Sequence, residues 1–146
     1  MTDIASIKLW HKRARPEPTA RDFNVQLGCH LEEVVEMLTS ISGGDGISVD
    51  KINTTAYIIS SLAEGLKLGT YDAWVINRKE FLDACCDQIV TAVGAAYCAQ
   101  MDVVKGMDIV QTSNWSKTVN GEFLRDENGK IKKPPSYIAP DLGGCV

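Results

Sequence analysis

The sequence lacks the features that mark membrane proteins, secreted proteins and nucleic-acid-binding proteins. It contains no run of about 18 apolar residues, the length that a helix needs to cross a bilayer. Three basic residues near the N-terminus, Lys8, Lys12 and Arg13, are not followed by the apolar segment of a signal peptide. The net charge is −4, whereas nucleic-acid-binding proteins usually carry a basic excess. We therefore expect no membrane span, no nucleic-acid partner and a cytoplasmic location.

Cysteine and histidine are scarce, and their spacing does not suit a disulfide framework or a histidine-based metal site. The five cysteines are odd in number and show no C-x-x-C spacing, so we expect free thiols in a reducing compartment. His11 and His30 are preceded, three residues earlier, by Lys8 and Leu27 rather than by glutamate. This spacing argues against a di-metal carboxylate oxidase bundle, which needs Glu-x-x-His pairs.

Apolar residues recur at helical spacing through most of the chain, and prolines or glycines separate the segments. Pro16 and Pro18 end the first segment, and Gly69 stops the third. Asn77, three residues before Glu80, is a capping signal for the fourth. The pattern predicts five helices, at about residues 3–14, 20–42, 51–68, 78–100 and 103–118.

The length of 146 residues is typical of one domain. We expect residues 1–146 to form an all-α fold, a four- to five-helix bundle over about 3–118 with a short C-terminal hairpin or arm over 119–146. In the arm, Asn128-Gly129 between two short runs is a hairpin signal. The residues expected to face inward are Ile4, Ile7, Trp10 and Ala14 in the first helix and Ile52, Ile59, Ala63 and Leu66 in the third.

Acidic residues interrupt the second helix on one side only. Glu33 and Glu36, three apart, are neighbours on the helix surface. They lie opposite an apolar stripe, so an ordinary surface helix with a solvated polar face would also explain them. The stripe consists of Leu27, Leu31, Val34, Leu38 and Ile41.

A second pair of acids lies on the fourth helix. Asp83 and Asp87, four apart, share a helix face. From Ala84 to Ala99 this helix is apolar or small nearly all round, which is typical of a buried helix. Gly94 on the same face would let another backbone approach closely. Buried carboxylates pair or bind metal, so two acid-bearing helices predict a site for a hard cation such as Mg²⁺.

The order of these features resembles the all-α nucleoside triphosphate pyrophosphatase superfamily, which includes MazG-like proteins, dimeric dUTPases and phosphoribosyl-ATP pyrophosphohydrolases. The resemblance covers about residues 20–142, and the chain is most similar to small phage-type MazG-like members, which carry SN-x-x-K and GK-x-x-KP elements. The matching elements are Gln26, Glu32-Glu33-x-x-Glu36, Asp83-x-x-x-Asp87, Ser113-Asn114-x-Ser116-Lys117, Gly129-Lys130-x-x-Lys133-Pro134 and Pro140-Asp141-Leu142.

The resemblance implies hydrolysis of a nucleoside triphosphate to a monophosphate and pyrophosphate, with two or more Mg²⁺ or Mn²⁺ ions per site. Glu32 would be a further metal ligand or the base that orients water, so the implied catalytic set is Glu32, Glu33 and Glu36. The implied metal ligands are Glu33, Glu36, Asp83 and Asp87.

Two registers of the family's Glu-x-x-Asp element are open on the fourth helix. If Asp87 is the family's aspartate, Ala84 stands at the glutamate position and Asp83 replaces the missing glutamate. If Asp83 is the aspartate, Glu80 stands there. We prefer the first register, because the apolar run follows Asp87 directly.

The remaining implied residues contact phosphates and base. Lys117, Lys130 and Lys133 would supply positive charge to the phosphates and Asn114 a hydrogen bond, although a solvated tail would also explain the lysines. Candidate base contacts are Trp10, His11, Asn24 and Gln26. Trp10 and Trp115 would either stack on a base or belong to the core.

The family also suggests a substrate and a partner. One branch, the MazZ-like enzymes of phages that use 2-aminoadenine, acts on guanine nucleotides, so we expect dGTP or GTP, with dUTP or dCTP as the runner-up. Family members are dimers or dimers of dimers, so we expect a homo-oligomer, in the host cytoplasm for a phage-encoded protein. A non-catalytic helical interaction module is the alternative, and it would show no turnover.

Overall fold

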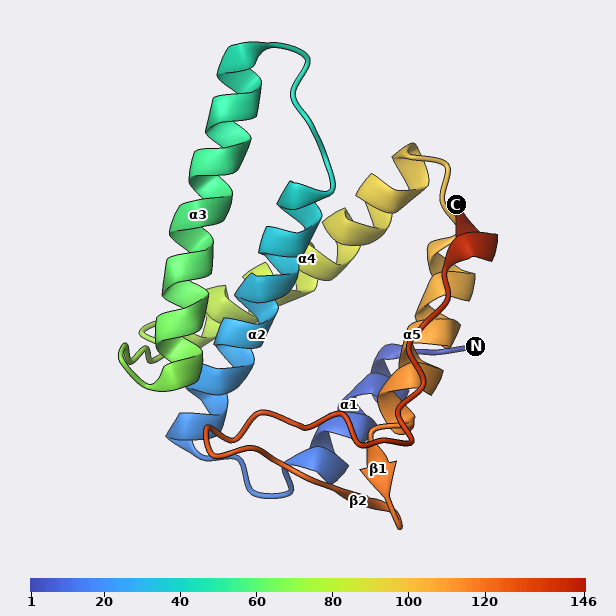
Figure 1. The fold of residues 1–146 in the computed structure, drawn as a ribbon. Coiled ribbons are helices and arrows are strands. Elements are labelled where there is room, and N and C mark those ends of the chain that lie inside the picture. Colours follow the sequence, from blue (N-terminus) through green and yellow to red (C-terminus); the bar gives the residue numbers. More distant parts are fainter. The chain divides into compact units, whose positions relative to one another are not determined.

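The chain is mostly α-helical, as predicted, in a computed structural model that describes residues 1–146. Two short strands form the one sheet, and a three-residue 3-10 helix lies near the C-terminus (Figure 1). The elements are α1 (Ile4–Ala14), α2 (Ala20–Thr39), α3 (Gly46–Leu68), α4 (Arg78–Cys98), α5 (Val103–Trp115), β1 (Thr118–Val119), β2 (Glu122–Phe123) and η1 (Gly143–Cys145).

The chain forms two compact units, each built from separate segments of sequence. Unit 1 contains α1, α4, α5 and the sheet, and unit 2 contains α2 and α3. The predicted arm is divided between them, because residues 125–130 belong to unit 2 and its other residues to unit 1.

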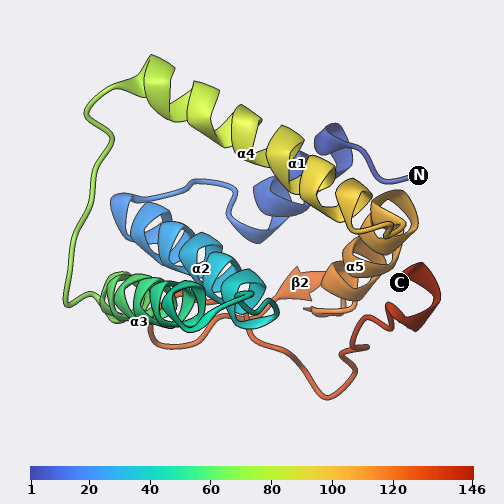
Figure 2. The ribbon, with the colours of Figure 1, turned by 90° about the horizontal axis from the view of Figure 1, so that it is seen from above.

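Unit 2 is a helical hairpin in which α2 and α3 lie side by side (Figures 1 and 2). Thr19 accepts a hydrogen bond from the backbone N–H of Asp22, whose carboxylate accepts from Thr19 in return, so α2 starts with a capping box. Gly69, with a φ of 79°, ends α3 as predicted. However, α3 starts earlier than expected, because Asp45 caps it through the N–H of Ser48.

The core of the hairpin lies where the two helices approach most closely. Val25, Ala63 and Leu66 are buried there. Gly28 permits the contact, because a Cβ on it would lie 2.7 Å from the carbonyl oxygen of Ala63. The predicted apolar stripe of α2 is confirmed as far as Leu38 by its partial burial, but α2 ends before Ile41, which is exposed.

In unit 1, α1 packs through an aromatic core. The indole N–H of Trp10 donates to the backbone oxygen of Asn114 at 3.0 Å, and Phe123 meets the Trp10 ring edge-on. Trp10 and Ala14 are buried as predicted. Ile4 is 64% exposed, so its predicted inward position is wrong; it lies in the first turn of the helix, next to the N-terminus.

The hairpin with paired strands was not expected from the sequence. β1 and β2 pair across Asn120-Gly121, both with positive φ, as a tight two-residue hairpin turn requires. The predicted Asn128-Gly129 turn is also present: the N–H of Asp126 donates to the oxygen of Lys130 at 2.9 Å and that of Lys132 to the oxygen of Leu124 at 2.8 Å. Single bridge residues rather than strands flank it.

The helix α4 differs most from expectation. Asn77 caps it through the N–H of Glu80, as predicted. However, none of its residues is buried, so the predicted burial is wrong for the single chain. Within unit 1, α4 meets α5 only near the turn that joins them (Figure 2). No atom lies within 4 Å of a Cβ built on Gly94. The exposed large apolar residues of α4 are Phe81, Leu82, Ile89, Val90, Val93 and Tyr97.

Two further features concern the whole chain. All five cysteines are free thiols, and Cys145 in η1 is the buried one. No helix combines the length and the apolar character that a bilayer crossing would need.

Candidate functional site

The residues predicted from the sequence to form one site are divided between the two units. Unit 2 holds Asn24, Gln26, Glu32, Glu33, Glu36 and Lys130, and unit 1 holds Trp10, His11, Asp83, Asp87, Asn114, Lys117 and Lys133. Within each unit, some of these residues meet and others do not.

The four predicted metal ligands are exposed carboxylates on two helices. Glu33 and Glu36 lie on α2, and Asp83 and Asp87 lie one turn apart on α4. Neither unit alone gathers three or more acidic, cysteine or histidine side chains in metal-binding geometry. The chemistry of the set nevertheless fits, since carboxylate oxygens are the ligands that Mg²⁺ and Mn²⁺ prefer. The four-carboxylate site stays a prediction.

Glu32 is held between two lysines in unit 2. Lys67 donates to one carboxylate oxygen at 2.7 Å and Lys130 to the other at 3.0 Å. Partial burial raises the pKa of Glu32, but the two lysines outweigh this effect, so the pKa lies below its ordinary value. Burial lowers the pKa of Lys130, and Glu32 raises it by more. A carboxylate that is so stabilised as an anion is a weak base at neutral pH.

The ion pair of Lys130 with Glu32 is one of several contacts that fasten residues 125–130 to the α2–α3 hairpin. Arg125 pairs with Asp22 at 2.9 Å, at the start of α2. Arg21 donates to the backbone oxygens of Leu66 and Lys67 at the end of α3, where a cation is favourable, and more weakly to that of Asn128. We call residues 125–130 the strap. Lys67 belongs to no motif, so its pairing with Glu32 could not be expected from the sequence.

Two candidate base contacts already have structural partners. The amide of Asn24 is buried; its oxygen accepts from the N–H of Ala73 at 2.7 Å, and its nitrogen donates to the oxygens of Ala20 and Ala73. Trp10 is buried with its N–H bonded to the backbone. Both side chains therefore hold the fold together, and Gln26 is half-buried.

His11 lies beside Trp10, and their rings meet edge to face at 4.9 Å. Burial lowers the pKa of His11, and the positive charge of Arg15 lowers it further. The imidazole is therefore neutral at pH 7, so it can both donate and accept a hydrogen bond.

Three of the four predicted phosphate contacts meet in unit 1. Lys117 donates to the side-chain oxygen of Asn114 at 2.7 Å, and its ammonium group lies 5.8 Å from the ring centroids of both Trp10 and Tyr137. The ammonium group of Lys133 lies 5.0 Å from the Tyr137 centroid. The SN-x-x-K and K-x-x-KP elements thus converge on one tyrosine, and we call Asn114, Lys117, Lys133 and Tyr137 the basic cluster.

The two serines of the first element hold the second element in place. Ser113 is buried, and its hydroxyl donates to the backbone oxygen of Ile138 at 2.7 Å. The hydroxyl of Ser116 accepts from the N–H of Ile138 at 2.9 Å. Because these two serines hold Ile138, they also fix the position of Tyr137, which directly precedes it in the chain. Tyr137 was not expected from the sequence, because no spacing rule links it to either lysine.

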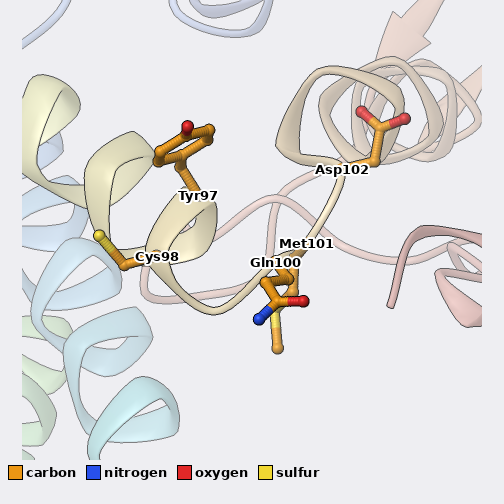
Figure 3. A pocket seen from close by; sticks show the side chains of 5 residues that line it. All are labelled: Tyr97, Cys98, Gln100, Met101 and Asp102. Atoms are coloured by element: carbon orange, nitrogen blue, oxygen red, sulfur yellow. The ribbon is translucent and has the colours of Figure 1, made fainter.

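An open hollow of about 540 Å³ lies where α4 meets α5 (Figure 3). Its lining side chains do not converge on a common point, and Asp102 is occupied in capping α5 through the N–H of Lys105. None of the predicted site residues lines it. The lining residues are Tyr97, Cys98, Gln100, Met101 and Asp102.

No protein-family model, curated protein or solved structure matches this chain. A functional assignment therefore depends on the order of the sequence elements and on the chemistry of the residues described above.

Proposed function

We propose that this protein is a metal-dependent pyrophosphohydrolase that converts a nucleoside or deoxynucleoside triphosphate and water to the monophosphate and pyrophosphate. The observation that carries the proposal is the basic cluster, in which Lys117 and Lys133 share the ring of Tyr137 beside Asn114. Two cations and an amide on one face suit a polyphosphate, because charge-assisted hydrogen bonds to phosphate oxygens are strong.

The exposed acids would supply the metal ligands. Glu36, Asp83 and Asp87 have no protein cation within ion-pair distance, and Glu33 shares the surface of α2 with Glu36. These four carboxylates would hold two or more Mg²⁺ or Mn²⁺ ions. Such ions, when bound, offset phosphate charge and lower the pKa of a coordinated water.

The other polar residues would act on the substrate directly. Lys117 and Lys133 would hold phosphate oxygens, and the amide nitrogen of Asn114 would donate to a third, since its oxygen is taken by Lys117. On substrate binding, Lys130 would leave its ion pair with Glu32 and donate to a phosphate oxygen instead. Glu32 itself serves better as the partner of Lys130 than as a base, because the lysines lower its pKa.

We propose dGTP and GTP as the preferred substrates, with dUTP or dCTP as the runner-up. The support is the family resemblance and the presence of groups that can read a base edge. Because Trp10 and Asn24 are buried, the accessible readers among the candidates are Gln26 and His11, an amide and a neutral imidazole.

We further propose that the protein is a homodimer or a dimer of dimers. The apolar residues of α4 are exposed along its whole length in the single chain, and an exposed apolar surface of this kind marks an interaction site. The same surface would also suit a non-catalytic helical interaction module, which is the second candidate function. Light scattering at micromolar concentration tests the assembly, and a monomer would contradict it.

A product analysis separates the two candidate functions. All common nucleoside and deoxynucleoside triphosphates are incubated at equal concentration with the protein and Mg²⁺, and the products are resolved by chromatography. We expect monophosphate and pyrophosphate, with guanine substrates consumed first, and no reaction in EDTA. A pyrimidine preference of about tenfold, equivalent to about 1.4 kcal/mol, would overturn the guanine assignment alone. No turnover of any nucleotide would favour the interaction module.

A further inference from the structure

The chain contains two Asn-Gly pairs, and the structure constrains them differently. Asn120-Gly121 forms the turn between β1 and β2 (Figure 1), and Asn128-Gly129 lies in the strap. Asparagine followed by glycine deamidates readily, because glycine has no side chain to hinder the attack of its backbone nitrogen on the preceding side-chain amide. Two copies of one dipeptide in one chain therefore show what the surrounding structure does to this reaction.

The turn at Asn120-Gly121 leaves the reacting groups unrestrained. Both residues are exposed, and neither the N–H of Gly121 nor the side-chain amide of Asn120 makes a hydrogen bond. The flanking strands contribute only two residue pairs, Thr118 with Phe123 and Val119 with Glu122. A ladder this short opens at a small cost in free energy, so the nitrogen of Gly121 can reach the amide.

The strap, by contrast, holds Asn128-Gly129 through its backbone. The N–H of Gly129 donates to the backbone oxygen of Asp126 at 3.0 Å, and the N–H of Asn128 donates to the Asp126 carboxylate at 2.9 Å. Arg21 donates weakly to the backbone oxygen of Asn128, and both residues of the pair are half-buried. The nitrogen that would attack is thus already bonded, and these bonds must break before it can react.

We propose that Asn120 is a site of spontaneous covalent modification, where the side chain deamidates through a cyclic succinimide, whereas Asn128 is protected. The backbone nitrogen of Gly121 loses its proton to solvent and attacks Cγ of Asn120. A C–N bond forms, the bond from Cγ to the side-chain nitrogen breaks, and that nitrogen takes a proton from water and leaves as ammonia. Water then adds to either carbonyl carbon of the ring and opens it to aspartate or isoaspartate. This inference does not depend on the proposed function.

The modification would change the packing of unit 1. Isoaspartate continues the backbone through its side chain and so lengthens the turn, which shifts the register of the two residue pairs beside it. Phe123 belongs to one of these pairs, and its ring centroid lies 5.3 Å from that of Trp10 and 6.3 Å from that of Trp115. Either product also adds a negative charge close to Glu122. We therefore expect the modified hairpin to loosen around the tryptophans.

The test is peptide mapping by mass spectrometry of the full chain, incubated at mildly alkaline pH and sampled over time. Each conversion replaces ammonia by water, and the mass gain is assigned to position 120 or 128. In the folded protein we expect conversion at Asn120 to be roughly tenfold faster than at Asn128, because the bonds of the strap must break first. In urea the two rates should converge. Equal rates in the folded protein, faster conversion at Asn128, or no conversion at Asn120 while the chain in urea reacts would overturn the proposal.

Two variants separate the reaction from the turn. Asn120→Gly tolerates positive φ and removes the amide, so conversion at position 120 should vanish. Asp126→Ala removes the carboxylate that accepts from the N–H groups of Asn128 and Lys130. It should speed conversion at Asn128 and leave that at Asn120 unchanged; an unaltered rate at Asn128 would contradict protection by the strap. Tryptophan fluorescence should change during incubation of the wild type but not of Asn120→Gly, and an unchanged wild-type spectrum would contradict the loosening of the hairpin.

Discussion

The α2–α3 hairpin and α4 show how differently helices of similar length are stabilised in this protein. All three helices start at a side-chain cap. The hairpin buries Val25 and Leu66 almost completely and is fastened to the strap by ion pairs. The helix α4 has no buried residue, although its sequence is apolar or small nearly all round from Ala84 to its C-terminal end.

The difference shows that a sequence can specify a helix without specifying what covers it. Capping and helical spacing are local, so they define α4 as clearly as α2. Most helix stability in proteins comes from packing of the apolar face, and α4 receives little of it from its own chain. In our account, assembly with another copy supplies that packing.

The largest effect is expected from substitutions of the predicted metal ligands, because α2 and α4 each carry one pair of these acids. Glu36→Gln on α2 and Asp87→Asn on α4 should each abolish Mg²⁺-dependent turnover, because each removes a charged ligand and leaves the metal set incomplete. Pyrophosphate release measures the effect. Lys51→Gln, an exposed change on α3, is the control and should remain active. Full turnover in either acid variant would refute its assignment as a ligand.

The next effect is on the packing of the hairpin. Gly28→Ala should destabilise the protein by about 1–3 kcal/mol, because overpacking forces the backbone to move. The added Cβ would lie 2.7 Å from the backbone oxygen of Ala63, which cannot rotate away. Urea unfolding measures the change. An unaltered midpoint would show that the hairpin is looser than described.

A smaller effect concerns the strap and its dependence on pH. Glu32→Gln should cost about 1 kcal/mol at pH 7, since it breaks two partly exposed ion pairs. The pKa of Glu32 in the folded protein lies below its ordinary value of 4.5. The stabilisation is therefore fully present above pH 4.5 and is lost as the pH falls through the pKa of the folded protein. The raised pKa of Lys130 keeps that lysine charged until above pH 10.5. Urea unfolding at neutral and at acid pH should show the difference from wild type disappear in acid; a constant difference would contradict the ion pairs.

The smallest effect is expected from a substitution of Gly94, which lies within α4 as Gly28 lies within α2. Gly94→Ala should stabilise the helix by up to about 1 kcal/mol, because alanine is the better helix former. No atom lies within 4 Å of the added Cβ, so there is no clash to offset the gain. Circular dichroism during heating measures the change. A loss of stability that deepens at higher protein concentration would place Gly94 in a close contact between copies.

The sequence predicted the five helices and most of their ends closely, because these depend on neighbouring residues. The start of α3, which Asp45 caps, was placed too late. The cap at Asn77 and the stop at Gly69 are both present. The burial of α4 was mispredicted, because an apolar pattern shows that a face needs a partner but not where the partner is. The turn at Asn120-Gly121 was missed although Asn-Gly is a strong hairpin signal, since the flanking runs are only two residues long.

The candidate site was predictable only in part. The SN-x-x-K and K-x-x-KP elements were selected by resemblance, and the convergence of Lys117 and Lys133 agrees with a shared role. Tyr137 and Lys67 were not found, because their roles arise from contacts between distant segments. The pairing of Glu32 with Lys67 and Lys130 likewise depends on the fold, which brings α3 and the strap to one face of α2.

The proposed reaction is tested by following GTP by phosphorus NMR with the wild-type protein, first without and then with Mg²⁺. We predict no change without the metal, and after its addition the appearance of GMP and pyrophosphate in equal amounts. The spectrum distinguishes cleavage between the α and β phosphates from loss of the γ phosphate. Formation of GDP and inorganic phosphate, or an unchanged spectrum with Mg²⁺ for every nucleotide in the panel, would contradict the account.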